Sequence, residues 1–90
     1  MTWKVEFDNR ARKELRKLDK QTQDRILKWI RENLATEAAP RRTGKILRGT
    51  MRGLWRYRVG DYRIISQIQD ANILILVVRI GHRSTIYEDK

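Results

Sequence analysis

The middle of the chain alternates between polar and apolar residues on both sides of a glycine. Residues 55–65 read Trp-Arg-Tyr-Arg-Val-Gly-Asp-Tyr-Arg-Ile-Ile. This alternation predicts two strands, and a Gly-Asp pair is typical of the two-residue loop of a β-hairpin. With that loop Arg58 lies directly opposite Arg63. Both then share one face with Arg56, while the aromatic side chains share the other face. A loop of another length would move Arg63 to the opposite face.

The hydrophobic pattern predicts one more strand and two helices before this hairpin. Residues 2–7 alternate as in a half-buried strand, and Asp8 or Asn9 then offers the N-cap of a helix. Asp19 offers the cap of a second, longer helix, with Trp29 at the flank of its apolar stripe. That stripe consists of Ile26, Leu27, Ile30 and Leu34. The short link between the two helices predicts an antiparallel helical hairpin packed on a sheet.

The remaining segments complete an α+β fold. Residues 35–53 are irregular and basic, which predicts a connection beside the arginine face. A strand over residues 62–69 reaches a turn at 70–72. The continuous apolar run 73–78 then predicts a central strand, covered on both faces and broken by Gly81. We therefore expect an N-terminal strand, a helical hairpin and a mainly antiparallel three-stranded meander, with the helices packed on one face of the sheet.

The composition describes a small and strongly basic chain. Its 90 residues suit one domain, 1–90, with a modest core. There are 21 Lys and Arg against 11 Asp and Glu, a formal net charge of +10, which favours a polyanion, an anionic membrane or an acidic protein as partner. Without cysteine, neither a disulfide scaffold nor a thiolate metal site can form. We see no membrane span and no signal peptide, and expect a cytoplasmic protein.

The arginine face and the segment after the last strand are the candidates for chemistry. Like charges directly opposite each other destabilise a hairpin. The opposed arginines are understandable if an anion normally binds to this face of the hairpin. The alternative is that they extend into solvent from an ordinary strand face. Arg56 and Arg58 stand roughly 6.6 Å apart along the strand, near the spacing of phosphates in a nucleic acid. His82, Arg83 and Tyr87 leave the sheet close by. These motifs contain few carboxylates, which argues against a metal-dependent nuclease.

Cleavage of RNA without a metal ion needs three kinds of group. A base accepts the proton of the ribose 2′-OH, an acid protonates the leaving 5′ oxygen, and cations stabilise the charge on the phosphorane. Arginines supply the cations, and His82 is of the residue type suited to proton transfer near neutral pH. Tyr87 could act as the base or stack on a nucleobase. A surface histidine and a core tyrosine are the structural alternatives.

Several segments of the chain resemble the RelE branch of the RelE/ParE toxin superfamily. They are residues 55–65, 79–83 (Arg-Ile-Gly-His-Arg) and 86–88 (Ile-Tyr-Glu), together with 45–49 and 7–18 upstream. The resemblance covers nearly the whole chain in the right order. It implies a toxin of a type II toxin–antitoxin pair, an endoribonuclease that cuts mRNA in the ribosomal A site without metal or cofactor. It also implies an acidic, RelB-like antitoxin as partner in a hetero-oligomer, in addition to the ribosome and mRNA.

The resemblance also implies roles for individual residues. Arg56 and Arg58 match the basic pair on the family's second strand, and Arg63 matches the arginine of its Gly-x-Tyr-Arg segment. Arg83 and Tyr87 match the C-terminal arginine and tyrosine implicated in catalysis. The catalytic residues that it implies are Arg63, Arg83, Tyr87 and His82. The phosphate-binding residues that it implies are Arg56, Arg58, Arg48 and Lys45.

Two other functions stay open at this point. One is a ParE-like toxin that inhibits DNA gyrase without nuclease activity, and the other is a plain RNA- or DNA-binding module. The segment Gly81-His82-Arg83 and the arginine face favour the nuclease, because a gyrase inhibitor does not need these residues together. Substitution of Arg83 and Tyr87 separates the hypotheses, since only the nuclease should lose activity while it keeps most of its affinity.

Overall fold

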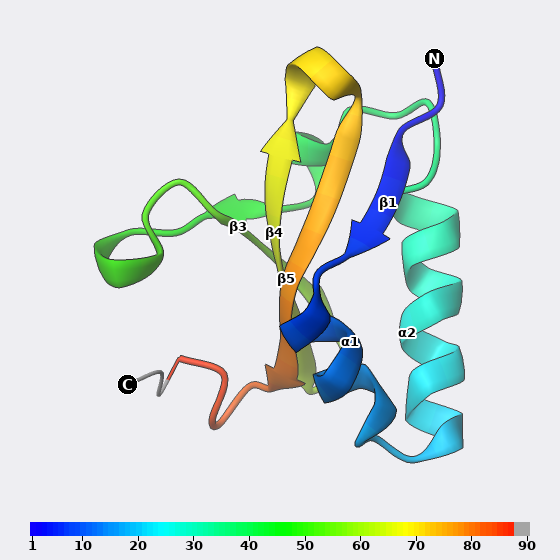
Figure 1. The fold of residues 1–90 in the computed structure, drawn as a ribbon, viewed down its shortest axis with the longest axis vertical. Coiled ribbons are helices and arrows are strands. Elements are labelled where there is room, and N and C mark those ends of the chain that lie inside the picture. Colours follow the sequence, from blue (N-terminus) through cyan, green and yellow to red (C-terminus); the bar gives the residue numbers. More distant parts are fainter. Residues whose placement is uncertain (88–90) are drawn as a thin grey trace.

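Two helices cover one face of a five-stranded sheet in the computed structural model, which describes residues 1–87 (Figure 1). The helices are α1 (Asn9–Arg16) and α2 (Lys20–Asn33). The strands are β1 (Lys4–Phe7), β2 (Lys45–Ile46), β3 (Trp55–Val59), β4 (Tyr62–Gln69) and β5 (Leu74–His82). Their order in the sheet is β1-β5-β4-β3-β2, and only the β1–β5 pair is parallel. This is the predicted α+β arrangement.

Both helices are capped by the predicted aspartates, Asp8 and Asp19. The carboxylate of Asp8 accepts a hydrogen bond from the Ala11 amide at 2.9 Å, and Asp19 accepts one from the Thr22 amide at 3.3 Å. Such caps satisfy backbone donors that have no partner within the helix. No helix of the described residues has the length and apolar character needed to cross a lipid bilayer.

The predicted apolar stripe of α2 is wrong at one position. Leu27 is exposed, whereas Ile26, Ile30 and Leu34 are buried. Trp29, which the pattern placed at the flank, packs against the core, and its ring centroid lies 5.7 Å from that of Tyr57. The large indole fills the space between α2 and the sheet, and the helix is rotated so that Leu27 faces solvent.

The β3–β4 hairpin has the predicted register. Val59 pairs with Tyr62 and Arg58 pairs with Arg63, so the loop consists of two residues. Gly60 has a φ of 59°, a backbone conformation that favours glycine. One face of the hairpin therefore packs under the helices, and the other carries its arginines.

Strand β5 continues through Gly81 to His82, so the prediction that Gly81 breaks this strand is wrong. The strand also contains a bulge, because Ile65 pairs with Arg79 while Ser66 pairs with Val77. On its face away from the helices the strand is half-buried rather than fully covered. Residue alternation alone does not indicate where a bulge shifts the register.

A carboxylate on α1 supports the bulged part of β5. Glu14 Oε1 accepts a hydrogen bond from the Ile80 amide at 2.9 Å, and Glu14 Oε2 lies 3.0 Å from Arg79 Nε. Buried backbone donors need such partners, because a buried amide without an acceptor costs stability. Glu14 thereby fixes the helix to the strand that leads into the candidate site.

The basic segment 35–53 is more ordered than the sequence indicated. It contains strand β2, in which Lys45 pairs with Arg56. It also contains two short 3₁₀ turns. Arg41 forms a two-pronged ion pair with Asp70, with N–O distances of 2.9 and 2.7 Å. The segment lies beside the arginine face, as predicted.

Candidate functional site

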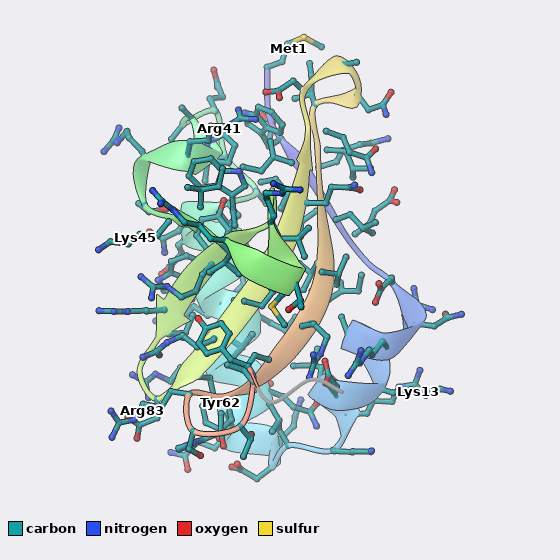
Figure 2. All side chains as sticks on the ribbon, turned by 90° about the vertical axis from the view of Figure 1, so that its left-hand side faces the viewer. Met1, Lys13, Arg41, Lys45, Tyr62 and Arg83 are labelled. Carbon is teal, nitrogen blue, oxygen red and sulfur yellow. The ribbon has the colours of Figure 1, made fainter. Side chains whose placement is uncertain are left out.

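An open pocket of about 460 Å³ lies on the face of the sheet away from the helices. Figure 2 looks onto this face, with Arg83 labelled near its lower edge and Lys45 on the same side at mid-height. The pocket is lined by Arg56, Arg58, Arg63, His82, Arg83, Ser84 and Tyr87, and we refer to it as the arginine pocket. Six of these seven residues were predicted as site residues from the sequence.

The arginines of the hairpin come from neighbouring strands and lack acidic partners. Arg58 of β3 and Arg63 of β4 lie directly opposite each other, and Arg56 lies two residues before Arg58 on β3. Within the described part of the chain, no carboxylate forms an ion pair with any of the three. Like charges at these positions destabilise the free hairpin. An anion in the pocket would relieve this repulsion.

Two of these guanidinium groups are held in different ways. Arg63 Nη1 donates to the carbonyl oxygens of Gly60 at 3.0 Å and Tyr62 at 2.9 Å, so the hairpin itself orients this side chain. Arg56 Nε is buried and has no hydrogen-bond partner. An unpaired buried donor is costly, so the Arg56 guanidinium keeps hydrogen-bonding capacity that the fold does not use.

The segment after β5 folds back over the sheet because residue 81 is a glycine. A Cβ atom at Gly81 would lie 2.9 Å from Ile86 Cδ1, and Ile86 is buried. The amides of Thr85 and Ile86 both donate to the His82 carbonyl, at 3.1 and 2.9 Å, and close a turn. Ile86 thus anchors the segment, and the next residue, Tyr87, reaches the arginine pocket with 47% of its surface exposed.

One ring nitrogen of His82 is already engaged within the chain. The Ser84 amide donates to His82 Nδ1 at 3.1 Å, and Ser84 Oγ lies 2.7 Å from the same atom. Because an amide can only donate, Nδ1 carries no proton in this arrangement, and Nε2 is the nitrogen available for proton transfer. The imidazole also meets the Tyr62 ring edge to face, with centroids 5.5 Å apart.

The Arg83 side chain is only loosely held at the edge of the pocket. Its backbone amide is fixed to the Asp61 carbonyl at 2.8 Å. Its guanidinium makes only a loose ion pair with the Asp61 carboxylate, at 3.6 Å, and both side chains are largely exposed. Exposed ion pairs of this kind are weak. The Arg83 side chain is therefore free to exchange Asp61 for a phosphate.

Two predicted phosphate-binding residues lie outside the arginine pocket. Lys45 pairs with Arg56, shares its face and is exposed, but does not line the pocket. Arg48 lies in a neighbouring recess that also contains Tyr87. Sequence reasoning missed Ser84, although this residue belongs to the same Gly-His-Arg-Ser run as His82.

The side chains of the pocket suit an anion with transferable protons nearby. Forked guanidinium donors bind phosphate oxygens well, and histidine and tyrosine are the two residues there that can exchange protons. Among residues 1–87, no three His, Asp or Glu side chains gather closely enough to hold a metal ion. The lining of the pocket can therefore hold a phosphate beside two groups that can exchange protons.

The chain matches a protein-family model and curated proteins along nearly its whole length. Residues 5–87 match the model described as the ParE toxin of the type II toxin–antitoxin system parDE. The chain is 32% identical to "Toxin RelG" of Mycobacterium tuberculosis, over 97% of this chain and 98% of that protein. It is 30% identical to "mRNA interferase toxin RelE" of Escherichia coli, over 99% of this chain and 94% of that protein.

Solved structures share the fold. The toxin–antitoxin complex RelBE2 of Mycobacterium tuberculosis matches with a TM-score of 0.83 and 30% identity, covering 93% of this chain and 94% of that chain. The RelE–RelB complex of Pyrococcus horikoshii matches with a TM-score of 0.71 and 32% identity, covering 92% and 97% respectively. The family-model match, residues 5–87, includes every residue that lines the arginine pocket.

Proposed function

The chain belongs to the ParE toxin family of type II toxin–antitoxin systems and is RelE-like, and from this premise we propose that it is an endoribonuclease. It cuts mRNA in the A site of a translating ribosome and so stops translation. The observation that carries this proposal is the arginine pocket, where a histidine and a tyrosine lie beside hairpin arginines that pair with no carboxylate of residues 1–87. A protein that works on ribosomes acts in the cytoplasm.

The arginines of the hairpin hold the scissile phosphate. Arg56 and Arg58 bind its non-bridging oxygens, and Arg63, already oriented by the hairpin carbonyls, polarises the phosphorus. Guanidinium groups fixed before the reaction stabilise the charge that develops on the phosphorane without further rearrangement. Arg83 leaves Asp61 and supports the transition state or the leaving oxygen. Lys45, exposed beside Arg56, extends the cationic surface for the flanking RNA.

Two residues of the pocket handle protons. The ribose 2′ oxygen attacks the adjacent phosphorus, its proton passes to a base, and the 5′ oxygen leaves with a proton from an acid. His82 takes part through Nε2, because Ser84 occupies Nδ1. Tyr87 takes the 2′ proton or orients the nucleotide by stacking. The products are a cyclic phosphate and a free 5′ hydroxyl, and no oxidant or cofactor is needed.

An acidic, RelB-like antitoxin is the proposed protein partner. The related toxins of Mycobacterium tuberculosis and Pyrococcus horikoshii occur in complexes with their antitoxins. The formal net charge of +10 favours association with an acidic chain, as it favours association with ribosomal RNA and mRNA. A hetero-oligomer of toxin and antitoxin would neutralise this surface when the toxin is not active.

Cell-free translation tests the proposal. Purified protein is added to a translation reaction, new mRNA 5′ ends are mapped, and the same mRNA without ribosomes serves as a control. The variants Arg83→Ala and Tyr87→Phe run in parallel with Arg31→Ala, which removes the same charge as the first from an exposed site on α2. We expect cuts in register with codons, only with ribosomes, lost in the first variant, reduced in the second and kept in the α2 control.

Intact mRNA with undisturbed translation would overturn the proposal. A supercoiling assay with DNA gyrase then tests the alternative function, that of a ParE-like gyrase inhibitor. If instead all variants bind RNA equally and none cuts it, the chain is a nucleic-acid-binding module.

A further inference from the structure

We propose that a recess beside the arginine pocket receives one nucleobase of the bound RNA strand, and that Leu47 and Met51 set the base preference. This inference rests on the proposed function, since it names a subsite for the same substrate. The recess has a volume of about 120 Å³. It is lined by Leu47, Arg48, Thr50, Met51 and Tyr87, and we refer to it as the loop recess.

Tyr87 belongs to both hollows. It lines the arginine pocket on one side and the loop recess on the other, and nearly half of its surface is exposed. In a single-stranded nucleic acid every phosphate lies next to a base. A strand whose phosphate occupies the arginine pocket therefore brings a base to the wall formed by Tyr87. Aromatic rings are the usual stacking surfaces for such bases.

The chemistry of the loop recess fits a base rather than another phosphate. Leu47 and Met51 are half-buried and apolar, and neither belongs to the core between helices and sheet. A base has apolar faces and a polar edge. The two aliphatic side chains suit the faces, and the exposed Thr50 hydroxyl, which both donates and accepts, suits the edge. Arg48 keeps the rim positive for the flanking phosphate.

The loop of residues 47–54, which forms most of the loop recess, is held in shape by its own backbone. The Leu47 amide donates to the Leu54 carbonyl at 2.8 Å, and the Leu54 amide donates to the Met51 carbonyl at 3.1 Å. Gly49 and Gly53 have φ values of 72° and 90°, which other residues rarely adopt. The loop projects from the sheet on the same side as the segment after β5 (Figure 1). A recess formed before binding costs little ordering when a base enters.

Single-turnover cleavage on programmed ribosomes tests the inference. The mRNAs carry, at each of the three A-site codon positions in turn, an abasic ribonucleotide that keeps its 2′-OH and phosphates. Wild type is compared with Leu47→Ala/Met51→Ala, with Thr50→Trp, which fills the recess, and with Ile46→Ala. Ile46 is an exposed apolar neighbour outside the recess, so its variant is the matched control.

We expect wild type to lose roughly 10- to 100-fold in rate when one particular base is absent, the range that stacking of a single base supplies. The double variant and Thr50→Trp should cut the intact codon slowly. Removal of that base should lower their rates little further, because the substitution and the missing base disrupt the same contact and their effects are not additive. Ile46→Ala should behave like wild type. Circular dichroism checks that each variant is folded, and Thr50→Trp tests the recess independently of the double variant.

Three results would overturn the inference. If both recess variants lost as much rate as wild type when the base is removed, the base would lie elsewhere. Equal wild-type rates on all three abasic codons would lead to the same conclusion. Variants that lose only antitoxin affinity would make the recess a protein-docking site. In each of these cases wild type still cuts the intact codon. If wild type cuts no programmed mRNA at all, the proposed function fails, and the subsite fails with it.

Discussion

Ile86 occupies the space that a side chain at position 81 would fill. A Cβ atom built on Gly81 lies 2.9 Å from Ile86 Cδ1 and 3.7 Å from its Cβ. Gly81 pairs with Arg63 across the sheet, so Ile86 is buried on the arginine face rather than in the core under the helices. This one contact positions the turn that carries Arg83 and Tyr87.

A valine at position 81 should separate stability from activity. Gly81→Val adds a residue that strands favour but displaces Ile86 and, with it, Tyr87. We expect the ribosome-dependent cleavage rate to fall at least about 10-fold, because small displacements of reacting groups are costly. The free energy of unfolding, from urea denaturation, should change by no more than about 1–3 kcal/mol. Partial rescue by the pair Gly81→Val/Ile86→Ala would identify the clash as the cause, and unchanged cleavage in Gly81→Val would contradict it.

Lysine should not replace Arg63, although it keeps the charge. Arg63 Nη1 is used by two hairpin carbonyls, and the other guanidinium nitrogens remain for the phosphate. An ammonium group cannot serve both sets of partners in this fixed geometry. We expect Arg63→Lys to lower the single-turnover cleavage rate by roughly 10²-fold, as for other single donors to a transition state. Arg31→Lys on α2 is the control and should leave the cleavage rate unchanged. If Arg63→Lys also cut at the wild-type rate, the positive charge alone would be sufficient at position 63.

The carboxylate of Glu14 should contribute more to stability than an exposed one. Glu14 accepts from the Ile80 amide and pairs with Arg79, whose side chain is only 12% exposed. Glu14→Gln removes the negative charge that faces the Arg79 guanidinium and weakens the acceptor of the Ile80 amide, so we expect a loss of about 1–3 kcal/mol in the free energy of unfolding. The control Asp24→Asn breaks an exposed pair with Lys20 and should cost at most about 0.5 kcal/mol. Urea denaturation measures the free energy of unfolding of both variants. Equal losses in the two variants would contradict the prediction.

Alkaline pH should destabilise the fold through Tyr57. Burial raises the pKa of Tyr57 to about 12, and its hydroxyl donates to the Pro40 carbonyl at 2.8 Å. In the unfolded chain a tyrosine titrates near pH 10. The stability due to the neutral phenol is therefore complete below pH 10 and is lost as pH rises from 10 to 12, by about 2 kcal/mol.

The variant Tyr57→Phe isolates this effect. At pH 7 it should be less stable than wild type by about 1 kcal/mol, since it lacks the hydrogen bond. Between pH 10 and 12 its free energy of unfolding should fall less steeply than that of wild type. Parallel pH profiles in the two proteins would show that other groups cause the alkaline loss.

Sequence reasoning succeeded where local signals determined the geometry. The Gly60-Asp61 loop determined the register of Arg58 and Arg63, and Asp8 and Asp19 capped the helices as expected. These features depend on neighbours in the chain, so alternation and capping preferences were sufficient to predict them.

The errors arose where distant residues decide. A glycine within an apolar run usually suggests a break, but here β4 continues to pair with Gly81, and the packing of Ile86 requires a residue without a side chain. The bulge near Val78 depends on the pairing of two strands. Helix periodicity likewise did not reveal that Trp29, rather than Leu27, would fill the space against Tyr57.

The position of β5 between β1 and β4 makes the pocket depend on the order in which the chain is synthesised. A nascent chain that has reached residue 73 contains the hairpin, but β1 has no parallel partner, and neither Gly81 nor Ile86 has yet been added. Contacts between residues so far apart in sequence form late and cost the most chain entropy. Arg83 and Tyr87 therefore join the other arginines only after residues 74–87 have emerged from the translating ribosome, and until then the nascent protein lacks its complete anion site.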